Sequence, residues 1–552
     1  MTEVTRRAGM GLIAGAAALA ATGAADAADT LFAHGVASGD PGSDSVVLWT
    51  RVTTTAPSLP VVWEVARDPA FRSLVRSGTV VADRDRDHTV KVVADGLAPG
   101  DRYHYRFRAA GRNSAAGRTR TLPTGRLDRL GIALMSCASR SLGYFNTYGA
   151  AAKDPAIDFV LHTGDYIYEY GDDLLKQSDR FLQPADPPHE IVTLDDYRRR
   201  HASHKADPQS QALHAAHPLI ALWDDHEIAN DSWIGGAENH QSAAEGAWPA
   251  RRDAAIRAYY EWMPVREPAP GGDRLEAWRT YRFGDLATMC TLETRLTARG
   301  QPVDYRAWKA KLRTVPERAA FLRDVLGDRS REMMSERGKA ALKAGLEASV
   351  AEQQPWRIVG NGTLLGRNFV PNLRRHGIRP EDHPELAFLD TYTDILWLAE
   401  NDLPDTTGAW DGYAGARQAF YELCQAAGAK DLLVLSGDSH AFWCNRLADD
   451  AGVAMGVEFG TAGVTMPSSF AMARFKPELI RKLDGLYARH NPEVQWTDGA
   501  HCGYVRVVLG REAATADFIG VDTSRPAADA TVTLRTDRVV RRNGGLALAA
   551  RG

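Results

Sequence analysis

The sequence predicts an α/β protein in which a small all-β domain precedes a larger domain of strands and helices. Residues 31–124 contain short β-branched and aromatic runs separated by Gly, Pro, Asp and Ser, which is typical of an all-β unit. After residue 124, apolar strand-like runs alternate with helical stretches, which indicates βαβ units. Several of these runs end on Asp, His, Cys or Tyr, the residue types that bind metal ions.

Size and composition limit the functions that are open to the chain. It has 552 residues, against roughly 150 for a typical domain, so we expect at least one large domain and a second unit. Apolar residues make up 44%, charged residues 25%, and the formal net charge is −4. This balance excludes a broad basic field, so no nucleic acid-specific partner is expected.

Residues 1–27 have the anatomy of an export signal. Arg6 and Arg7 precede an uncharged Gly/Ala-rich stretch, and a small-x-small cleavage pattern closes it at Ala27. The arginine pair favours the twin-arginine (Tat) export machinery as a partner during secretion, and a periplasmic or extracellular location. The alternative is a disordered terminus with a chance arginine pair. No second long apolar segment follows, so we expect no membrane span in the mature chain.

Residues 28–124 are expected to form a β-sandwich. Within them, residues 96–108 lead from a turn into a strand with alternate tyrosines, a pattern that resembles fibronectin type III domains. The strands are predicted at residues 46–52, 59–66, 77–83, 88–96 and 102–111.

Residues 125–552 are expected to form the larger domain. Helices are predicted at residues 145–155, 194–205 and 243–263, and an exposed helical insertion at about 305–354. This insertion could shape the entrance of a pocket. Of the five cysteines, at least one cannot form an internal disulfide, and four are expected to be buried thiols: Cys290, Cys424, Cys444 and Cys502.

Five apolar runs end on polar residues that can bind a metal ion. Active sites collect beyond the carboxyl ends of strands, because loops converge there on a rigid sheet. The pattern therefore predicts a two-metal site. Its residues are Cys137, Asp165 with Tyr168, Asp225 with His226, Asn361, and Asp438 with His440.

Each motif also has a purely structural explanation. Asp165 could cap a helix, with Tyr168 a buried aromatic residue. The acidic run 224–227 could be a solvated loop, since charged residues are mostly exposed. Asn361 could belong to an Asn-Gly turn, and His440 could be an ordinary core or surface histidine.

Taken in order, the motifs SCAS, HTGDYIYEYG, LWDDHEIAND and LSGDSHAFW resemble the alkaline phosphatase D (PhoD-type) family of the metallophosphoesterase superfamily. The segment FAHGVASGDPGSDSVVLWTRV resembles the start of that family's N-terminal domain, so the likeness covers nearly the whole mature chain. It implies a metallophosphoesterase-type two-sheet αββα core. It also implies a small phosphoester substrate, a phosphomonoester or a diester, hydrolysed by a metal-activated hydroxide.

The resemblance also implies how the ligands are divided between two ions bridged by Asp165. A thiolate, a phenolate and an imidazole suit ferric iron, and these come from Cys137, Tyr168 and His440. Oxygen donors alone suit calcium, and these come from Asp165, Asp225, Asn361 and Asp438.

Three further residues are candidates for catalysis beside the bridging Asp165. His226 is placed to contact the phosphate or to protonate the leaving group. Arg140 and Arg295 are possible phosphate contacts, although surface arginines are an equally good interpretation.

Two other functions remain open at this level. The same site could be specialised as a phosphodiesterase or a phospholipase D-type enzyme. The chain could instead be a non-catalytic secreted binding protein, which is disfavoured because every expected ligand position holds a competent donor.

Overall fold

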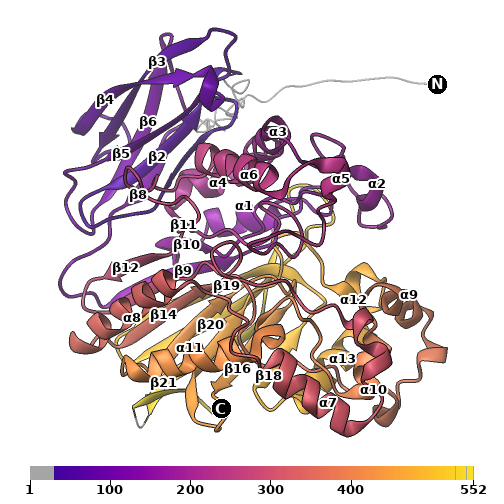
Figure 1. The fold of residues 1–552 in the computed structure, drawn as a ribbon. Coiled ribbons are helices and arrows are strands. Elements are labelled where there is room, and N and C mark those ends of the chain that lie inside the picture. Colours follow the sequence, from indigo (N-terminus) through magenta and orange to yellow (C-terminus); the bar gives the residue numbers. More distant parts are fainter. Residues whose placement is uncertain (1–29, 529, 543, 551–552) are drawn as a thin grey trace, which may run out of the picture.

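The computed structural model describes residues 30–528, 530–542 and 544–550, so the predicted export signal lies outside the described residues. The described part contains three sheets (Figure 1). The largest has ten strands in the order β22 (Gly545–Leu548), β21 (Thr531–Arg542), β20 (Ala513–Val521), β19 (Cys502–Gly510), β9 (Arg129–Met135), β10 (Phe159–His162), β11 (Leu219–Ala221), β1 (Val36–Gly39), β2 (Val46–Arg51) and β5 (Thr89–Ala94).

The two smaller sheets of the described chain differ in position. The first has seven strands in the order β12 (Arg279–Phe283), β13 (Ala287–Thr291), β14 (Trp356–Asn361), β15 (Leu432–Ser436), β17 (Ala454–Gly460), β16 (Phe442–Ala448) and β18 (Val494–Asp498). The second lies in the N-terminal region and contains β4 (Leu74–Asp83), β3 (Ser58–Ala66), β6 (Arg102–Ala109), β7 (Arg112–Asn113) and β8 (Gly117–Arg120).

The central strands are apolar along their whole length because both of their faces are covered. Strands β10 and β15 are buried at every position. Leu134 and Leu161 of the ten-stranded sheet share one buried cluster with Ile358 and Leu433 of the seven-stranded sheet. The two large sheets therefore pack face to face around a common core.

Helices cover the outer faces of these two sheets (Figure 1). The outer face of the ten-stranded sheet packs against α1 (Asn146–Ala152), α3 (Leu194–Lys205), α4 (Pro208–Ala216) and α6 (Trp248–Trp262). The outer face of the seven-stranded sheet packs against α8 (Glu336–Ala351) and α11 (Ala414–Ala426). This arrangement confirms an α/β fold.

A separate helical cluster lies beside the seven-stranded sheet. It includes α7 (Val315–Phe321), α9 (Pro384–Thr393), α10 (Ile395–Asn401) and α13 (Pro477–His490). Short helices complete the set: α2 (Asp172–Leu175), α5 (Ser242–Glu245) and α12 (Ser469–Met472). The predicted insertion is helical in α7 and α8, but sequence patterns did not single out α9, α10 or α13.

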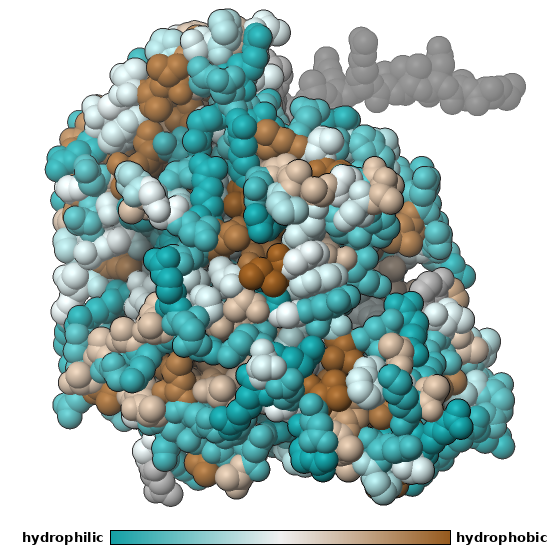
Figure 2. Space-filling view, viewed as in Figure 1, coloured by the Kyte–Doolittle hydropathy of each residue, from teal (hydrophilic) through white to brown (hydrophobic). Residues whose placement is uncertain are grey.

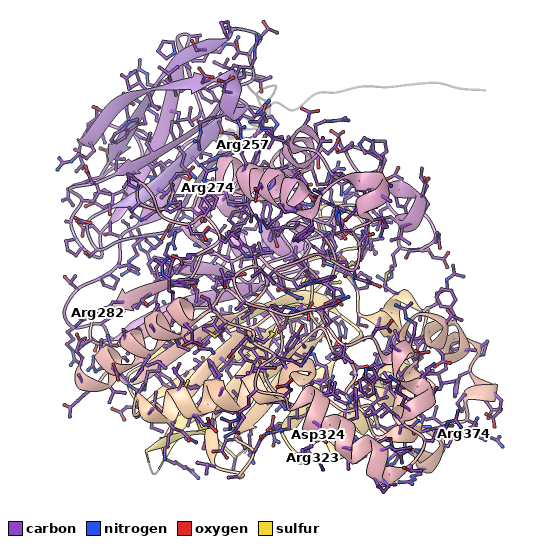
Figure 3. The ribbon with its side chains drawn as sticks, in the orientation of Figure 1. Arg257, Arg274, Arg282, Arg323, Asp324 and Arg374 are labelled. Carbon is purple, nitrogen blue, oxygen red and sulfur yellow. The ribbon has the colours of Figure 1, made fainter. Side chains whose placement is uncertain are left out.

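The N-terminal region shares a sheet with the larger domain. Strand β1 pairs in parallel with β11 through Gly39 and Leu219, so β1, β2 and β5 extend the ten-stranded sheet. The Trp49 indole donates a hydrogen bond of 2.8 Å to the Glu261 carbonyl on α6. Figure 3 shows Arg257 where α6 meets this region, and its guanidinium donates to the Asp85 carbonyl. A separate fibronectin III-like sandwich therefore stays a prediction.

Surface and thiol properties agree with the composition. Figure 2 shows hydrophobic side chains in small patches among hydrophilic ones on the face in view. Among the described helices, none combines the length and apolarity needed to cross a bilayer. All five cysteines are buried free thiols, as predicted for four of them.

Candidate metal centre

The strand ends of both large sheets meet at one edge, and the predicted ligands lie there together. Cys137 follows β9, Asp165 follows β10 and His440 follows β15, yet their ligand atoms all lie within 4.8 Å of one another. The same holds for the carboxylates of Asp165, Asp225 and Asp438. Asp165 belongs to both groups, which is the position predicted for a bridging ligand.

Hydrogen-bond distances link the members of the first group. The Cys137 Sγ lies 3.4 Å and the Tyr168 hydroxyl 3.2 Å from the same Asp165 Oδ2. The Tyr168 hydroxyl is also 3.2 Å from the His440 Nε2. Burial lowers the pKa of His440 to about 3, which keeps its imidazole in the neutral form that binds metals.

The second group contains one carboxylate more than the sequence predicted. Asp224 lies with Asp165, Asp225 and Asp438 in one cluster. Asn361 ends β14 next to this cluster, since a Cβ added to Gly362 would lie 2.7 Å from the Asp224 Oδ1. In this structure the Asn361 side chain donates to the Thr363 carbonyl and accepts from Trp410 at 3.3 Å. The position of Asn361 beside the acidic cluster fits the prediction, but its side-chain amide is hydrogen-bonded to Thr363 and Trp410.

Four of the predicted ligands have left-handed backbone. The φ angles are 61° for Cys137, 54° for Asp165, 67° for Asp438 and 56° for His440. Each such residue costs on the order of 1–3 kcal/mol and persists only where the surroundings impose it, typically at functional sites. This left-handed backbone turns the chain sharply at each of these strand ends, so that the side chain points into the cluster.

Replacing Gly164 by alanine should disrupt this edge. Gly164 has φ +103°, and an added Cβ would lie 2.5 Å from both the Asp224 Cβ and its backbone nitrogen. We expect thermal unfolding to show a loss of about 1–3 kcal/mol, and hydrolysis to fall because Asp165 and Asp224 are displaced. Gly111→Ala is the control, since Gly111 has φ +76° with nothing within 4 Å. Equal activity losses in both variants would contradict the expected clash.

The electrostatics of the cluster fit a bound cation. The Asp165 Oδ1 is buried without a hydrogen-bond partner, and the buried Asp225 Oδ1 has no hydrogen bond but lies 3.4 Å from the Arg295 guanidinium. Burial and the neighbouring carboxylates raise the pKa of Asp165 well above its usual range. Burial and Asp224 raise the pKa of Asp438 to about 7. Carboxylates that repel one another and retain free oxygens need a positive charge between them.

His226 lies beside the cluster and is held by a second carboxylate. The His226 Nδ1 lies 2.7 Å from the Glu169 Oε2. The other oxygen of Glu169, Oε1, accepts a hydrogen bond of 2.8 Å from the Asn230 backbone amide. Burial alone would lower the pKa of His226, but the charges of Glu169 and Asp225 raise it well above its usual value. The imidazole therefore lies next to Asp165 with its ring orientation set by Glu169.

The two arginines singled out from the sequence have different surroundings. Arg295 is buried against the cluster and pairs with Asp224 at 2.5 and 2.8 Å, with Asp438 at 3.7 Å. It acts as a fixed counter-charge for the acids. Arg140 donates a hydrogen bond of 3.1 Å to the Pro184 carbonyl. It forms no hydrogen bond or ion pair with the described residues of the cluster.

Glu227 and Glu169 were not singled out as site residues from the sequence. The buried Glu227 carboxylate accepts from the backbone amides of Asp165 at 3.0 Å, Tyr166 at 2.6 Å and Asp224 at 2.8 Å. It therefore ties together two ligand loops. Glu169 directly follows the predicted ligand Tyr168 and Glu227 follows the catalytic candidate His226, but the sequence does not tell a ligand from the residue that orients it.

A cleft opens from the acidic end of the cluster. Its volume is about 710 Å³, and Asp438, Ser439 and Asp231 lie where it meets the cluster. Ligand sites in proteins commonly have about 300–1,000 Å³, so the cleft can hold the organic part of a small substrate.

Both the sequence and the fold of the chain match known proteins. The chain matches the family described as PhoD-like phosphatase over residues 132–518, and the PhoD-like phosphatase N-terminal domain over residues 16–123. It is 31% identical over 503 residues to alkaline phosphatase D of Bacillus subtilis (strain 168), covering 88% of this chain and 77% of that protein. A solved structure of PhoD superposes with a TM-score of 0.76 at 28% identity, covering 95% of this chain and 93% of that one.

Proposed function

Because this chain belongs to the PhoD-like phosphatase family, we propose that it is a metal-dependent phosphoester hydrolase whose two metal ions are bridged by Asp165. Phosphatase activity follows from the family. The observation that supports a metal centre is the convergence of Cys137, Tyr168 and His440 on one side of Asp165 and of acids on the other.

The donor types support iron on one side and calcium on the other. Thiolate, phenolate and imidazole favour ferric iron, whereas the oxygen donors of Asp225, Asn361 and Asp438 favour calcium. Asp224 is a further oxygen donor within the acidic cluster. Bound cations would lower the pKa of a water molecule and neutralise charge on the phosphoryl oxygens.

The residues of the chain perform the remaining steps. The cluster carboxylates orient the attacking water opposite the leaving oxygen. His226, held by Glu169 at 2.7 Å, donates a proton to the leaving oxygen. Arg295 stays paired with Asp224 and holds the acidic side chains of the cluster in place. The two packed sheets are proposed to be the αββα core of a metallophosphoesterase.

Metal content and colour test the assignment. We expect the exported protein to contain iron and calcium and to show a visible band from charge transfer between Tyr168 and iron. Tyr168→Phe should lose the band, and chelation should abolish hydrolysis. Tyr170→Phe is the matched control, because Tyr170 stacks on Tyr168 at 6.3 Å without joining the cluster. Absence of both metals, with no hydrolysis when they are supplied, would refute the proposal.

Two finer points are part of the same proposal. The chain is exported through the Tat route, and fractionation of cells expressing Arg6→Lys/Arg7→Lys should find it retained inside.

The cleft of about 710 Å³ leaves room for a second ester substituent, which favours some diester hydrolysis. The rates of hydrolysis of an aryl phosphomonoester and of its matching diester measure how much diester hydrolysis the enzyme performs.

A further inference from the structure

The cleft beside the metal centre extends to a second group of polar and aromatic residues. One part of its lining, called the far end below, consists of Asp484 and Tyr487 of α13, Trp443 of β16, Phe470 of α12 and Asp405. None of these is a predicted metal ligand. The far end is therefore available to the organic part of a substrate whose phosphate lies at the cluster.

The charged lining of the cleft is almost entirely acidic. Arg306 is the basic residue among the described lining residues. The acids are Asp231, Glu238, Asp304, Asp394, Asp405, Asp411, Asp438 and Asp484. Such a lining repels additional phosphates or carboxylates on a substrate and attracts cations.

Most of these acids already have a cationic partner. Asp304 pairs with Arg306, Asp394 with Lys309, Asp411 with Arg417, and Asp231 with Arg299. Among the described residues, neither Asp405 nor Asp484 forms an ion pair, and Glu238, which accepts from the Asn230 side chain, forms none either. Asp405 is hydrogen-bonded by the Asn368 amide at 3.4 Å, and Asp484 by the Gly499 backbone amide at 3.2 Å.

Burial dominates the electrostatics of both carboxylates, although the more distant charges of His501 and Arg481 partly offset it at Asp484. Burial and the charge of Asp411 raise the pKa of Asp405 to about 6. Burial raises the pKa of Asp484 to about 8. Burial and then the charges of both carboxylates raise the pKa of Tyr487, which lines the same cleft.

Aromatic rings surround these acids and keep unused polar groups. Tyr487 lies 6.3 Å from Trp443 and 6.1 Å from Phe470, edge to face in both pairs. The Tyr487 hydroxyl and the Trp443 indole nitrogen are buried without hydrogen-bond partners, in side chains only 3% and 6% exposed. Buried polar groups without partners are rare, so they point to a ligand.

We propose that the far end of the cleft binds an alkylammonium group, so that the preferred substrates are phosphoesters of amino alcohols. The aromatic faces attract the cation, Asp405 and Asp484 neutralise it, and the Tyr487 hydroxyl accepts from a protonated amine. This inference rests on the proposed function. In hydrolysis the water oxygen bonds to phosphorus, the bond from phosphorus to the alkoxide oxygen breaks, and the amino alcohol leaves with a proton.

A pair of esters of equal shape tests the proposal on the metal-loaded enzyme. Phosphocholine and 3,3-dimethylbutyl phosphate differ in having a cationic nitrogen or a neutral carbon at one position. We expect kcat/KM for phosphocholine to be about tenfold higher or more. Phosphoethanolamine, a primary ammonium ester, distinguishes binding through the carboxylates from binding on aromatic faces.

Variants assign the preference to these residues. Asp484→Asn and Asp405→Asn should bring the ratio of the two kcat/KM values close to one. Asp304→Asn removes a charge from the same cleft that Arg306 already compensates, so the ratio should be retained. Asp484→Asn should not lower the Tm, because it removes an unpaired buried charge. A ratio unchanged in both unpaired-acid variants would overturn the assignment.

Binding alone separates this inference from the proposed function. Choline should raise the Tm of the metal-loaded enzyme, whereas 3,3-dimethylbutanol should not. If no ester is hydrolysed but choline stabilises the protein, the proposed function fails and the cation site stands. If the esters are hydrolysed at equal rates and choline gives no shift, the cation site fails and the proposed function stands.

Discussion

Asp165→Asn should reduce phosphoester hydrolysis by on the order of 10³-fold or more, beyond the roughly 10–100-fold that groups orienting a ligand contribute. The physical reason is the shared position of this carboxylate. Its Oδ2 meets the Cys137 Sγ and the Tyr168 hydroxyl, and its Oδ1 is buried and free. An amide has half the acceptors and no charge, so it cannot bridge two cations.

The Tm of the metal-free Asp165→Asn variant should not fall, in contrast to its activity. Burial and repulsion by its neighbours raise the pKa of Asp165, so its charge destabilises the metal-free fold. We expect metal-free Asp165→Asn to unfold at the same or a higher Tm, and to lose the increase that metals give the parent protein.

An exposed acid nearby provides the control for this variant. Asp173→Asn changes an exposed side chain at the start of α2, and it should keep both the activity and the metal-dependent increase in Tm. If Asp165→Asn still responded to metals as the parent does, Asp165 would not be the bridge.

Glu227→Gln should reduce activity by about 10–100-fold and stability by about 1–3 kcal/mol. Both oxygens of this buried carboxylate accept from backbone amides, at Asp165, Tyr166 and Asp224. A glutamine presents an NH₂ group to at least one of these donors in either orientation, so one amide loses its partner. The two ligand loops then separate, and metal affinity falls with kcat.

A distant carboxylate with the same backbone role separates positioning from folding. Asp68 accepts from the amides of Ala70, Arg72 and Ser73 in the N-terminal region, far from the cluster in the chain. Asp68→Asn should lose some stability and keep metal affinity. If Glu227→Gln lost only stability while retaining metal affinity and kcat, its role would be structural.

Local sequence patterns predicted most of the residues that the structure places in the cluster. An apolar strand followed by Asp, Cys or His predicts both the strand and the side chain at its carboxyl end, because both depend on neighbours within a few residues. Cys137, Asp165, Tyr168, Asp225, Asp438 and His440 were found in this way, and the structure brings them together. The helix at residues 194–205 was also predicted, since its capping residues and its pattern are local.

Other parts of the site depend on pairs of residues that are distant in the sequence. Arg140 and Arg295 were candidates for phosphate contact or for surface positions, and in the structure Arg295 is buried and pairs with Asp224 while Arg140 donates to the Pro184 carbonyl. Nothing near either arginine in the sequence indicates which carboxylate or carbonyl it will meet.

By itself, the sequence determined which candidate donors this protein has and that they follow buried strands, because residue type and strand pattern are local properties. Only the tertiary structure decided which of them lie within reach of one another. It also decided that Asp224 joins the cluster, that β1 extends the large sheet through β11, and that Asp405 and Asp484 lie unpaired in one cleft. Those outcomes depend on how two sheets and a helical cluster pack together, and charge pairing across that packing is not encoded in any short segment.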